Sequence, residues 1–336
     1  MTRRKVTGRV TGLVAFLATA VLLSLAPVAT AATPSARFSD FQSGLQLAVQ
    51  AQEAFDRGAY DRAELLQEQA LPLFERALGP EDLRLVGPLA SLAEVYQVRG
   101  RFDRAELLYG RLTFLMTEAF GPSDIRVATA LASAAEAVAG QGRYDQAREM
   151  YARALAIQQA TLGPDDPRVL PLLMNLADAD SAGGRFEEAA SLYRQAREIS
   201  EKAFGSEDLA IAGPLDGEAA ARAAGGRLDL AEALYRRELA LVEQAFGPSN
   251  VHALYVLNQL ADVYVKAERY GEAEPLYRRS LAILEARFGP EHVRVAAFRE
   301  KYAALLLKLG REPEARQHEA RAKANRAAND PASAVQ

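Results

Sequence analysis

The chain of 336 residues contains no cysteine and no tryptophan, and it has only three histidines. Without cysteine it cannot form disulfides, thiolate metal sites, iron–sulfur clusters or a cysteine nucleophile. A basic excess is also missing, because 44 acidic and 40 basic side chains leave a formal charge of −4. Proteins that neutralise nucleic-acid phosphates need such an excess, so we expect no nucleic-acid partner. The 49% hydrophobic content is enough for a large core.

The sequence also lacks the motifs of common active sites. It has no G-x-x-x-x-G-K phosphate loop, no H-E-x-x-H metal motif and no G-x-S-x-G nucleophile elbow. His252 and His292 fall at expected helix starts and His318 lies in the last expected helix, so we do not expect the three imidazoles to share a metal ion. The sequence therefore predicts a protein that is not an enzyme and that holds no cofactor or metal.

The first 31 residues have the pattern of a signal peptide. Basic residues between positions 3 and 9 precede an apolar run over 13–25, and small residues follow at 29–31. We therefore expect cleavage after Ala31 and a periplasmic or secreted protein, with an uncleaved N-terminal anchor as the alternative. Four of the 40 basic residues lie in this segment, so the remainder has 36 basic against 44 acidic residues, a net charge of −8.

From residue 39 onward the sequence repeats every 42 residues without insertion or deletion. One column of the repeat consists of Ala63, Ala105, Ala147, Ala189, Ala231, Ala273 and Ala315. Another column, which marks a tight turn, consists of Gly58, Gly100, Gly142, Gly184, Gly226 and Gly310. Between the turns apolar residues recur at helical spacing, which predicts two amphipathic helices of about 17 residues in each repeat.

A single helix pair is too thin to bury its own apolar face, so the pairs must stack on one another. The period predicts an all-α solenoid of about seven helix pairs over residues 39–327, in which 292–327 form a capping pair. Residues 32–38 are expected to be a linker and 328–336 a disordered tail. Pro88 and Pro214, which occupy one column, should kink or restart the first helix of their pairs.

The repeat resembles the tetratricopeptide repeat (TPR), in particular the 42-residue form of kinesin light chains. The resemblance rests on Leu176-Ala177, the turn GGRFEEA from Gly183, LYRQA from Leu192 and LGPDDPRV from Leu162. It implies a right-handed superhelix whose concave face, lined by the first helix of each pair, holds a peptide or a partner helix. The export signal argues against a kinesin role.

The resemblance also places polar side chains on the concave face. Family grooves often carry asparagines in an L-N-N-L-A segment, which only Asn175 and Asn258 match here. An acidic column follows this groove position three residues later, and it would attract a basic or amine-bearing partner. The alternative interpretation of this column is a solvated face of ordinary charged helices. The predicted groove residues are Ser91, Glu94, Ser133, Glu136, Asn175, Asp178, Asn258 and Asp262.

These patterns predict a non-catalytic scaffold or adaptor of the cell envelope that binds a basic protein segment or peptide. After signal cleavage no integral membrane segment is expected. The alternative function is an accessory subunit that binds an anionic envelope polymer or a membrane surface through an arginine edge. That edge would consist of Arg101, Arg143, Arg185, Arg227, Arg269 and Arg311.

A second arginine column lies in the first turn of the groove helices. Its members are Arg84, Arg126, Arg168 and Arg294. A cation at this end of a helix opposes the helix dipole, so the column suggests a partner from a neighbouring repeat or a ligand.

Overall fold

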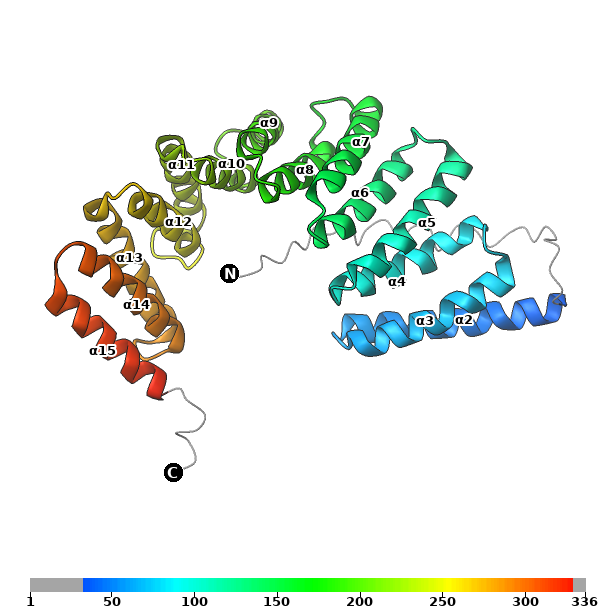
Figure 1. The fold of residues 1–336 in the computed structure, drawn as a ribbon, viewed down its shortest axis with the longest axis horizontal. Helices are drawn as coiled ribbons and strands as arrows, with labels where there is room; N and C mark the ends of the chain where they lie inside the picture. The colour runs from blue at the N-terminus through cyan, green and yellow to red at the C-terminus, as the bar shows by residue number, and fades with distance from the viewer. Residues whose placement is uncertain (1–32, 329–336) are drawn as a thin grey trace. The chain divides into compact units, whose positions relative to one another are not determined.

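The computed structural model describes residues 33–328, and every regular element in that range is a helix (Figure 1). The predicted signal peptide over 1–31 and residues 329–336 of the predicted tail lie outside the described residues. The linker expected over 32–38 is helical from Pro34 onward. Thr33 caps this helix, because its Oγ1 accepts the Ala36 amide at 3.3 Å, and proline is tolerated in the first turn.

The helices form two compact units, divided after Gly183. Unit 1 contains α2 (Pro34–Asp56), α3 (Tyr60–Leu78), α4 (Val86–Val98), α5 (Phe102–Phe120), α6 (Ile125–Gly140), α7 (Tyr144–Leu162) and α8 (Leu170–Ala182). Unit 2 contains α9 (Phe186–Phe204), α10 (Ala212–Ala224), α11 (Leu228–Phe246), α12 (Ala253–Lys266), α13 (Tyr270–Phe288), α14 (Val293–Lys308) and α15 (Glu312–Ala328). Even-numbered helices come first in their pairs and odd-numbered helices second.

Within each unit every helix packs against the next one along the chain, as a solenoid of helix pairs requires. The alanine column from Ala63 to Ala315 lies where the helices approach most closely, and each of its seven members is fully buried. Each glycine of the turn column has a positive φ, between 73° and 81°, which closes the first helix and starts the turn. Glu268 takes the same place between α12 and α13 with φ 57°.

Five of the first helices begin in one of two ways. In α6 and α14 the helix starts directly after its capping residue, Asp124 or His292. In α4, α8 and α10 a short 3-10 turn comes first, at Leu83–Leu85, Pro167–Val169 and Leu209–Ile211. These three helices carry a proline in the first α-helical turn, where no backbone donor is needed. The predicted restart at Pro88 and Pro214 is therefore confirmed.

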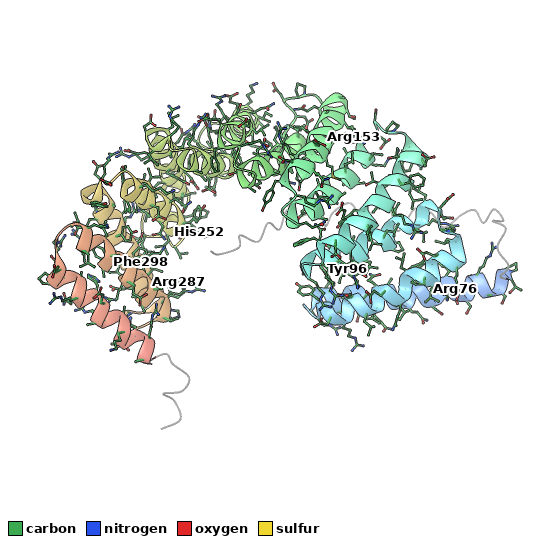
Figure 2. The ribbon with its side chains drawn as sticks, in the orientation of Figure 1. Arg76, Tyr96, Arg153, His252, Arg287 and Phe298 are labelled. Atoms are coloured by element: carbon green, nitrogen blue, oxygen red, sulfur yellow. The ribbon has the colours of Figure 1, made fainter. Side chains whose placement is uncertain are left out.

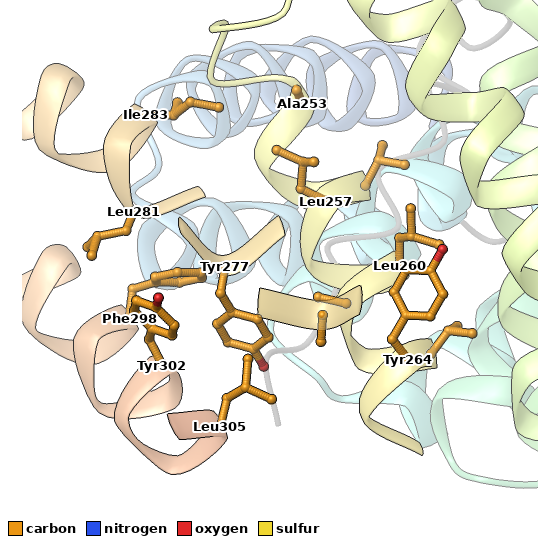
Figure 3. Packing of buried hydrophobic residues seen from close by; sticks show 14 of the residues in the cluster. Ala253, Leu257, Leu260, Tyr264, Tyr277, Leu281, Ile283, Phe298, Tyr302 and Leu305 are labelled. Atoms are coloured by element: carbon orange, nitrogen blue, oxygen red, sulfur yellow. The ribbon is translucent and has the colours of Figure 1, made fainter. Parts of the chain in front are cut away.

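The core of unit 2 is a continuous apolar layer between successive helices (Figure 3). Tyr277 of α13 lies 5.4 Å from Phe298 and 6.1 Å from Tyr302 of α14, measured between ring centroids. Leu257 and Leu260 of α12 belong to the same layer. The tyrosines on the second helices are buried in the same way, at Tyr109, Tyr151, Tyr193, Tyr235 and Tyr277.

Candidate partner-binding surface

The eight predicted groove residues lie on four first helices. Six of them are on α4, α6 and α8 of unit 1, whereas Asn258 and Asp262 are on α12 of unit 2. Asp178 and Asp262 are exposed and the other six are half-buried. All eight side chains thus keep some surface that a partner could contact.

In unit 1 the structure brings together Glu94, Glu136 and Asp178, which we call the acidic row. Burial raises the pKa of Glu94, and the negative charge of Asp56 raises it further. Burial also raises the pKa of Glu136, and the negative charge of Glu94 raises it further. A hydrogen bond with Gln97 lowers the same pKa. Glu94 and Glu136 are therefore close enough to repel each other.

Two buried tyrosines connect the members of the acidic row. Burial raises the pKa of Tyr109, and the charges of Glu94 and Glu136 contribute to the increase. Burial likewise raises the pKa of Tyr151, with contributions from Glu136 and Asp178. Each phenol therefore lies within electrostatic reach of two consecutive carboxylates. The Tyr109 hydroxyl donates a hydrogen bond of 2.6 Å to Gln97 Oε1, which holds the ring in place.

Asp262 in unit 2 has a different environment from the acidic row. Burial raises its pKa, but the positive charges of Lys301 and Lys266 lower it. Asn258 lies one residue before the groove column, whose member in α12 is Gln259. The Gln259 amide donates to the Tyr235 hydroxyl at 3.2 Å. The surface of α12 is therefore of mixed charge, and Gln259 rather than Asn258 is the counterpart of Asn175.

Asp56 extends the acidic row at the end of α2, and the sequence analysis missed it. The member of the acidic column in α2 is Gln52, whose Nε2 donates to Asp56 Oδ1 at 2.9 Å. Asp56 stands four residues later and hence on the same helical face. A search by the 42-residue period alone overlooks it, whereas a search that combined the period with i,i+4 spacing would have found it.

The arginines of the alternative basic edge are mostly engaged in ion pairs within the chain. Four of the six contact a glutamate 37 residues earlier, on the preceding second helix. These pairs are Arg101–Glu64, Arg143–Glu106 at 2.6 Å, Arg269–Glu232 at 2.5 Å and Arg311–Glu274 at 2.6 Å. The guanidinium groups thus connect successive repeats and are locally neutralised.

The second arginine column has local partners, which corrects the expectation of a neighbouring repeat or a ligand. Arg84 forms an ion pair with Asp82 at 2.6 Å. Equivalent ion pairs join Arg126 to Asp124 at 2.8 Å and Arg168 to Asp166 at 2.7 Å. Each aspartate also caps the helix by accepting a backbone N–H from the arginine two residues later. The hydrogen bonds from the arginine guanidinium, together with those from the backbone N–H, lower the pKa of Asp124 and Asp166 to about 2. The capping aspartate offsets the unfavourable position of the cation.

The three histidines each pack on a different aromatic ring in unit 2. His252, labelled in Figure 2, lies 4.5 Å from the ring centroid of Phe246, and His292 lies 5.0 Å from that of Phe288. His318 packs on Tyr302 at 4.7 Å. Among residues 33–328 no three His, Asp or Glu side chains are arranged to hold a metal ion. Over the same range no helix combines the length and apolar character needed to cross a membrane.

Comparison with known proteins gives family matches over most of the repeat region. A model of the tetratricopeptide repeat matches residues 126–202, 212–286 and 252–328, and a second model of the same repeat matches residues 51–83. No curated protein matches the chain.

Several solved structures are similar to this one. A putative kinesin light chain with nearly identical TPR-like repeats from Podosopora anserina has 24% identity and a TM-score of 0.56, over 62% of this chain and 98% of that one. BtubC from P. vanneervenii has 21% identity and a TM-score of 0.54, and the match covers 70% of this chain and 91% of BtubC. Aspartyl phosphate phosphatase F from Bacillus subtilis has 14% identity and a TM-score of 0.56, and the match covers 90% of this chain and 74% of the phosphatase.

At these identities the likeness to solved structures concerns the fold alone. The family models, in contrast, match more than half of the sequence, and the structure consists of stacked helix pairs over the matched residues. The chain belongs to the tetratricopeptide repeat family.

Proposed function

We propose that this protein is an exported, non-catalytic adaptor whose unit 1 binds a basic segment of another protein along the acidic row. TPR domains generally serve as protein–protein interaction scaffolds. The observation that carries the proposal is the set of carboxylates on α4, α6 and α8. The charge of Glu94 raises the pKa of Glu136, and Glu136 and Asp178 both act on the Tyr151 phenol between them.

A row of this kind favours a cationic ligand on energetic grounds. Burial and neighbouring negative charges both disfavour the ionised form of Glu94 and Glu136. A lysine or arginine between them would remove the mutual repulsion and add attraction in a partly desolvated setting. Carboxylates that are separate and fully hydrated gain less from a cation, because water already screens them.

Neutral polar side chains accompany each carboxylate. Ser91, Ser133 and Asn175 stand three residues before Glu94, Glu136 and Asp178, and this spacing puts each pair on one helical face. Hydroxyl and amide groups at these positions can donate to and accept from the backbone of an extended peptide. The surface therefore offers one cation site and one backbone contact per repeat.

The alternative function, binding of an anionic polymer through an arginine edge, has less support. It requires arginines that can reach a ligand, whereas Arg143, Arg269 and Arg311 lie within 2.6 Å of glutamates of the same unit. An anionic ligand would have to displace these carboxylates, which lowers the net gain.

The test is a fluorescence anisotropy titration with two dye-labelled probes, octalysine and octaglutamate. The test variant combines Glu94→Lys, Glu136→Lys and Asp178→Lys. The control variant combines Glu81→Lys, Asp103→Lys and Glu149→Lys, which are exposed in unit 1 and change the net charge equally. We expect the test variant to bind octalysine about tenfold more weakly than the control variant does, a difference of roughly 1.4 kcal/mol.

Circular dichroism establishes that each variant is folded, and glutamine substitutions at the same three positions replace any lysine variant that is not. Equal weakening in the test and control variants would reject the acidic row as the site. Tighter binding of octaglutamate than of octalysine by the unmodified protein would favour the arginine edge.

A further inference from the structure

The exposed face of α5 carries a pattern of large apolar residues around a glycine. Leu107 is 74% exposed and Phe114 is 55% exposed, although α5 packs its opposite face on α4 and α6. Gly110 lies between them at the centre of the helix. On the neighbouring helix α3, Leu65 is 55% exposed and Pro72 is also exposed, and these two residues stand 42 positions before Leu107 and Phe114.

The remaining second helices lack large aliphatic or aromatic residues at the equivalent positions. The counterparts of Leu107 in the later repeats are Glu149, Ser191, Ala233 and Pro275. The counterparts of Phe114 are Ala156, Glu198, Ala240 and Ala282, and those of Gly110 are Ala152, Arg194, Arg236 and Arg278. The large exposed apolar side chains are thus specific to the first two pairs and are not a requirement of the repeat.

Gly110 has no role in the packing of its own chain. A Cβ atom added there would meet nothing within 4 Å, and the residue is in a regular helix. A glycine inside a helix costs about 1 kcal/mol relative to alanine. What the glycine provides is a low point in the surface, at which the backbone of another helix can approach α5 closely.

The helices that carry this face are firmly connected to each other. Arg104 of α5 lies 3.2 Å from Glu68 of α3, and Arg111 of α5 forms an ion pair with Glu75 of α3. The apolar side chains therefore project from a two-helix surface whose geometry is set before any partner arrives, which lowers the entropic cost of binding.

We propose that this face of α5 binds the same face of a second copy of the chain, with the two helices antiparallel and crossing near Gly110. Leu107 stands three residues before the glycine and Phe114 four residues after it. An antiparallel crossing at this point places Leu107 of each copy against Phe114 of the other, so one contact occurs twice, as a two-fold axis requires.

Charge favours the same arrangement. Arg104 lies on the N-terminal side of the crossing and the exposed Glu118 on the C-terminal side. Arg104 keeps about half of its side chain exposed while it contacts Glu68, so in an antiparallel dimer its guanidinium can also attract Glu118 of the other copy. A helix from an unrelated protein would need these complements by coincidence, whereas a second copy supplies them by symmetry.

Sedimentation equilibrium of the purified protein tests the proposal. We expect a monomer–dimer equilibrium that Leu107→Glu abolishes. Leu307→Glu serves as the matched control, because Leu307 is a leucine of α14 that is 48% exposed, and it should leave the dimer intact. Gly110→Ala should raise the melting temperature of the monomer through its helix propensity and yet weaken the dimer several-fold, because the added methyl group holds the helices apart.

The absence of cysteine permits a second, independent measurement. Gly110→Cys should form an interchain disulfide rapidly under mild oxidation, since residues at a two-fold crossing can come within disulfide range. Gly271→Cys is the control, because Gly271 is an exposed helical glycine of α13 whose surroundings are equally open. A monomer at all concentrations, a dimer that survives Leu107→Glu, or equal crosslinking at 110 and 271 would overturn the proposal.

Discussion

At the residue scale, the acidic row should make stability depend on pH. The pKa of Glu94 is raised in the folded chain, so the folded state binds its proton more readily than the unfolded state. Stability due to this group therefore falls as the pH rises through the raised pKa. We expect Glu94→Gln to increase the urea midpoint of unfolding at about pH 7 and to increase it less at about pH 4. The exposed Glu149→Gln is the control, and a lower midpoint for Glu94→Gln would contradict the expectation.

A buried ion pair joins α9 to α10. Arg197 Nε lies 3.1 Å from Glu218, which is 5% exposed, and Arg197 also contacts Glu201 at 3.0 Å. Leucines occupy the position of Arg197 in four other repeats, at Leu71, Leu155, Leu239 and Leu281. The position of Glu218 is leucine in three, at Leu92, Leu176 and Leu260. The ion pair thus occupies two positions that are leucine in several other repeats.

This arrangement predicts opposite effects for single and double substitutions. Glu218→Leu leaves the Arg197 guanidinium in the core without one of its carboxylates, and we expect it to cost about 3 kcal/mol. Adding Arg197→Leu removes the buried charge and restores the packing of the neighbouring repeats, so the double variant should be at least as stable as the original chain. Urea denaturation measures the free energy of unfolding of the single and the double variant. A double variant that is less stable than Glu218→Leu would show that the charges are required.

At the scale of helices, the capping aspartates Asp82, Asp124 and Asp166 should each contribute to stability through two interactions. Asp82 accepts the Arg84 backbone N–H at 2.9 Å and pairs with the Arg84 guanidinium. We expect Asp82→Ala to lose about 1 kcal/mol, and Asp82→Asn to lose less because asparagine also caps helices. The contacts with Arg84 lower the pKa of Asp82, so this contribution is present above the ordinary carboxyl pKa and is lost as the pH falls through the lowered value. Thermal unfolding of both variants at neutral and acidic pH measures the effect, and equal melting temperatures for the original chain and Asp82→Ala would contradict it.

Helices and turns were predictable from the sequence because their determinants are local. The alanine column that begins at Ala63 specifies one close contact between helices. The glycine column that begins at Gly58 specifies one backbone conformation in the turn. Side-chain pairs between helices were not predictable in the same way. The ion pair of Arg143 with Glu106 and the approach of Asp56 to Glu94 depend on how two helices pack and how far a side chain reaches. The 42-residue period alone carries no information on how the helices pack or on how far a side chain reaches.

The prediction of the binding surface depended on the family resemblance for its location. Periodicity identified the acidic column, but it treated Asp178 and Asp262 as equivalent. The structure separates them, because lysines at 266 and 301 act on Asp262 while a tyrosine links Asp178 to Glu136. Local spacing cannot distinguish a row of like charges from a surface of mixed charge when the difference comes from the neighbouring helices.

At the scale of the whole molecule, the account requires that the chain is exported. The apolar run over 13–25 and the small residues at 29–31 predict cleavage after Ala31. We expect intact-mass analysis of the protein recovered outside the cytoplasm to give a chain that begins at Ala32. A mass that includes residues 1–31 in the membrane fraction would instead indicate the uncleaved anchor.

The proposed function rests on selection of the partner by the acidic row. The most direct measurement is a quantitative capture from envelope and secreted fractions of the source cells. It uses the unmodified protein, the Glu94→Lys, Glu136→Lys, Asp178→Lys variant and the Glu81→Lys, Asp103→Lys, Glu149→Lys control as baits. The account predicts a partner with a basic segment that the unmodified and control baits retain and the row variant loses. A partner that all three folded baits retain equally would contradict it.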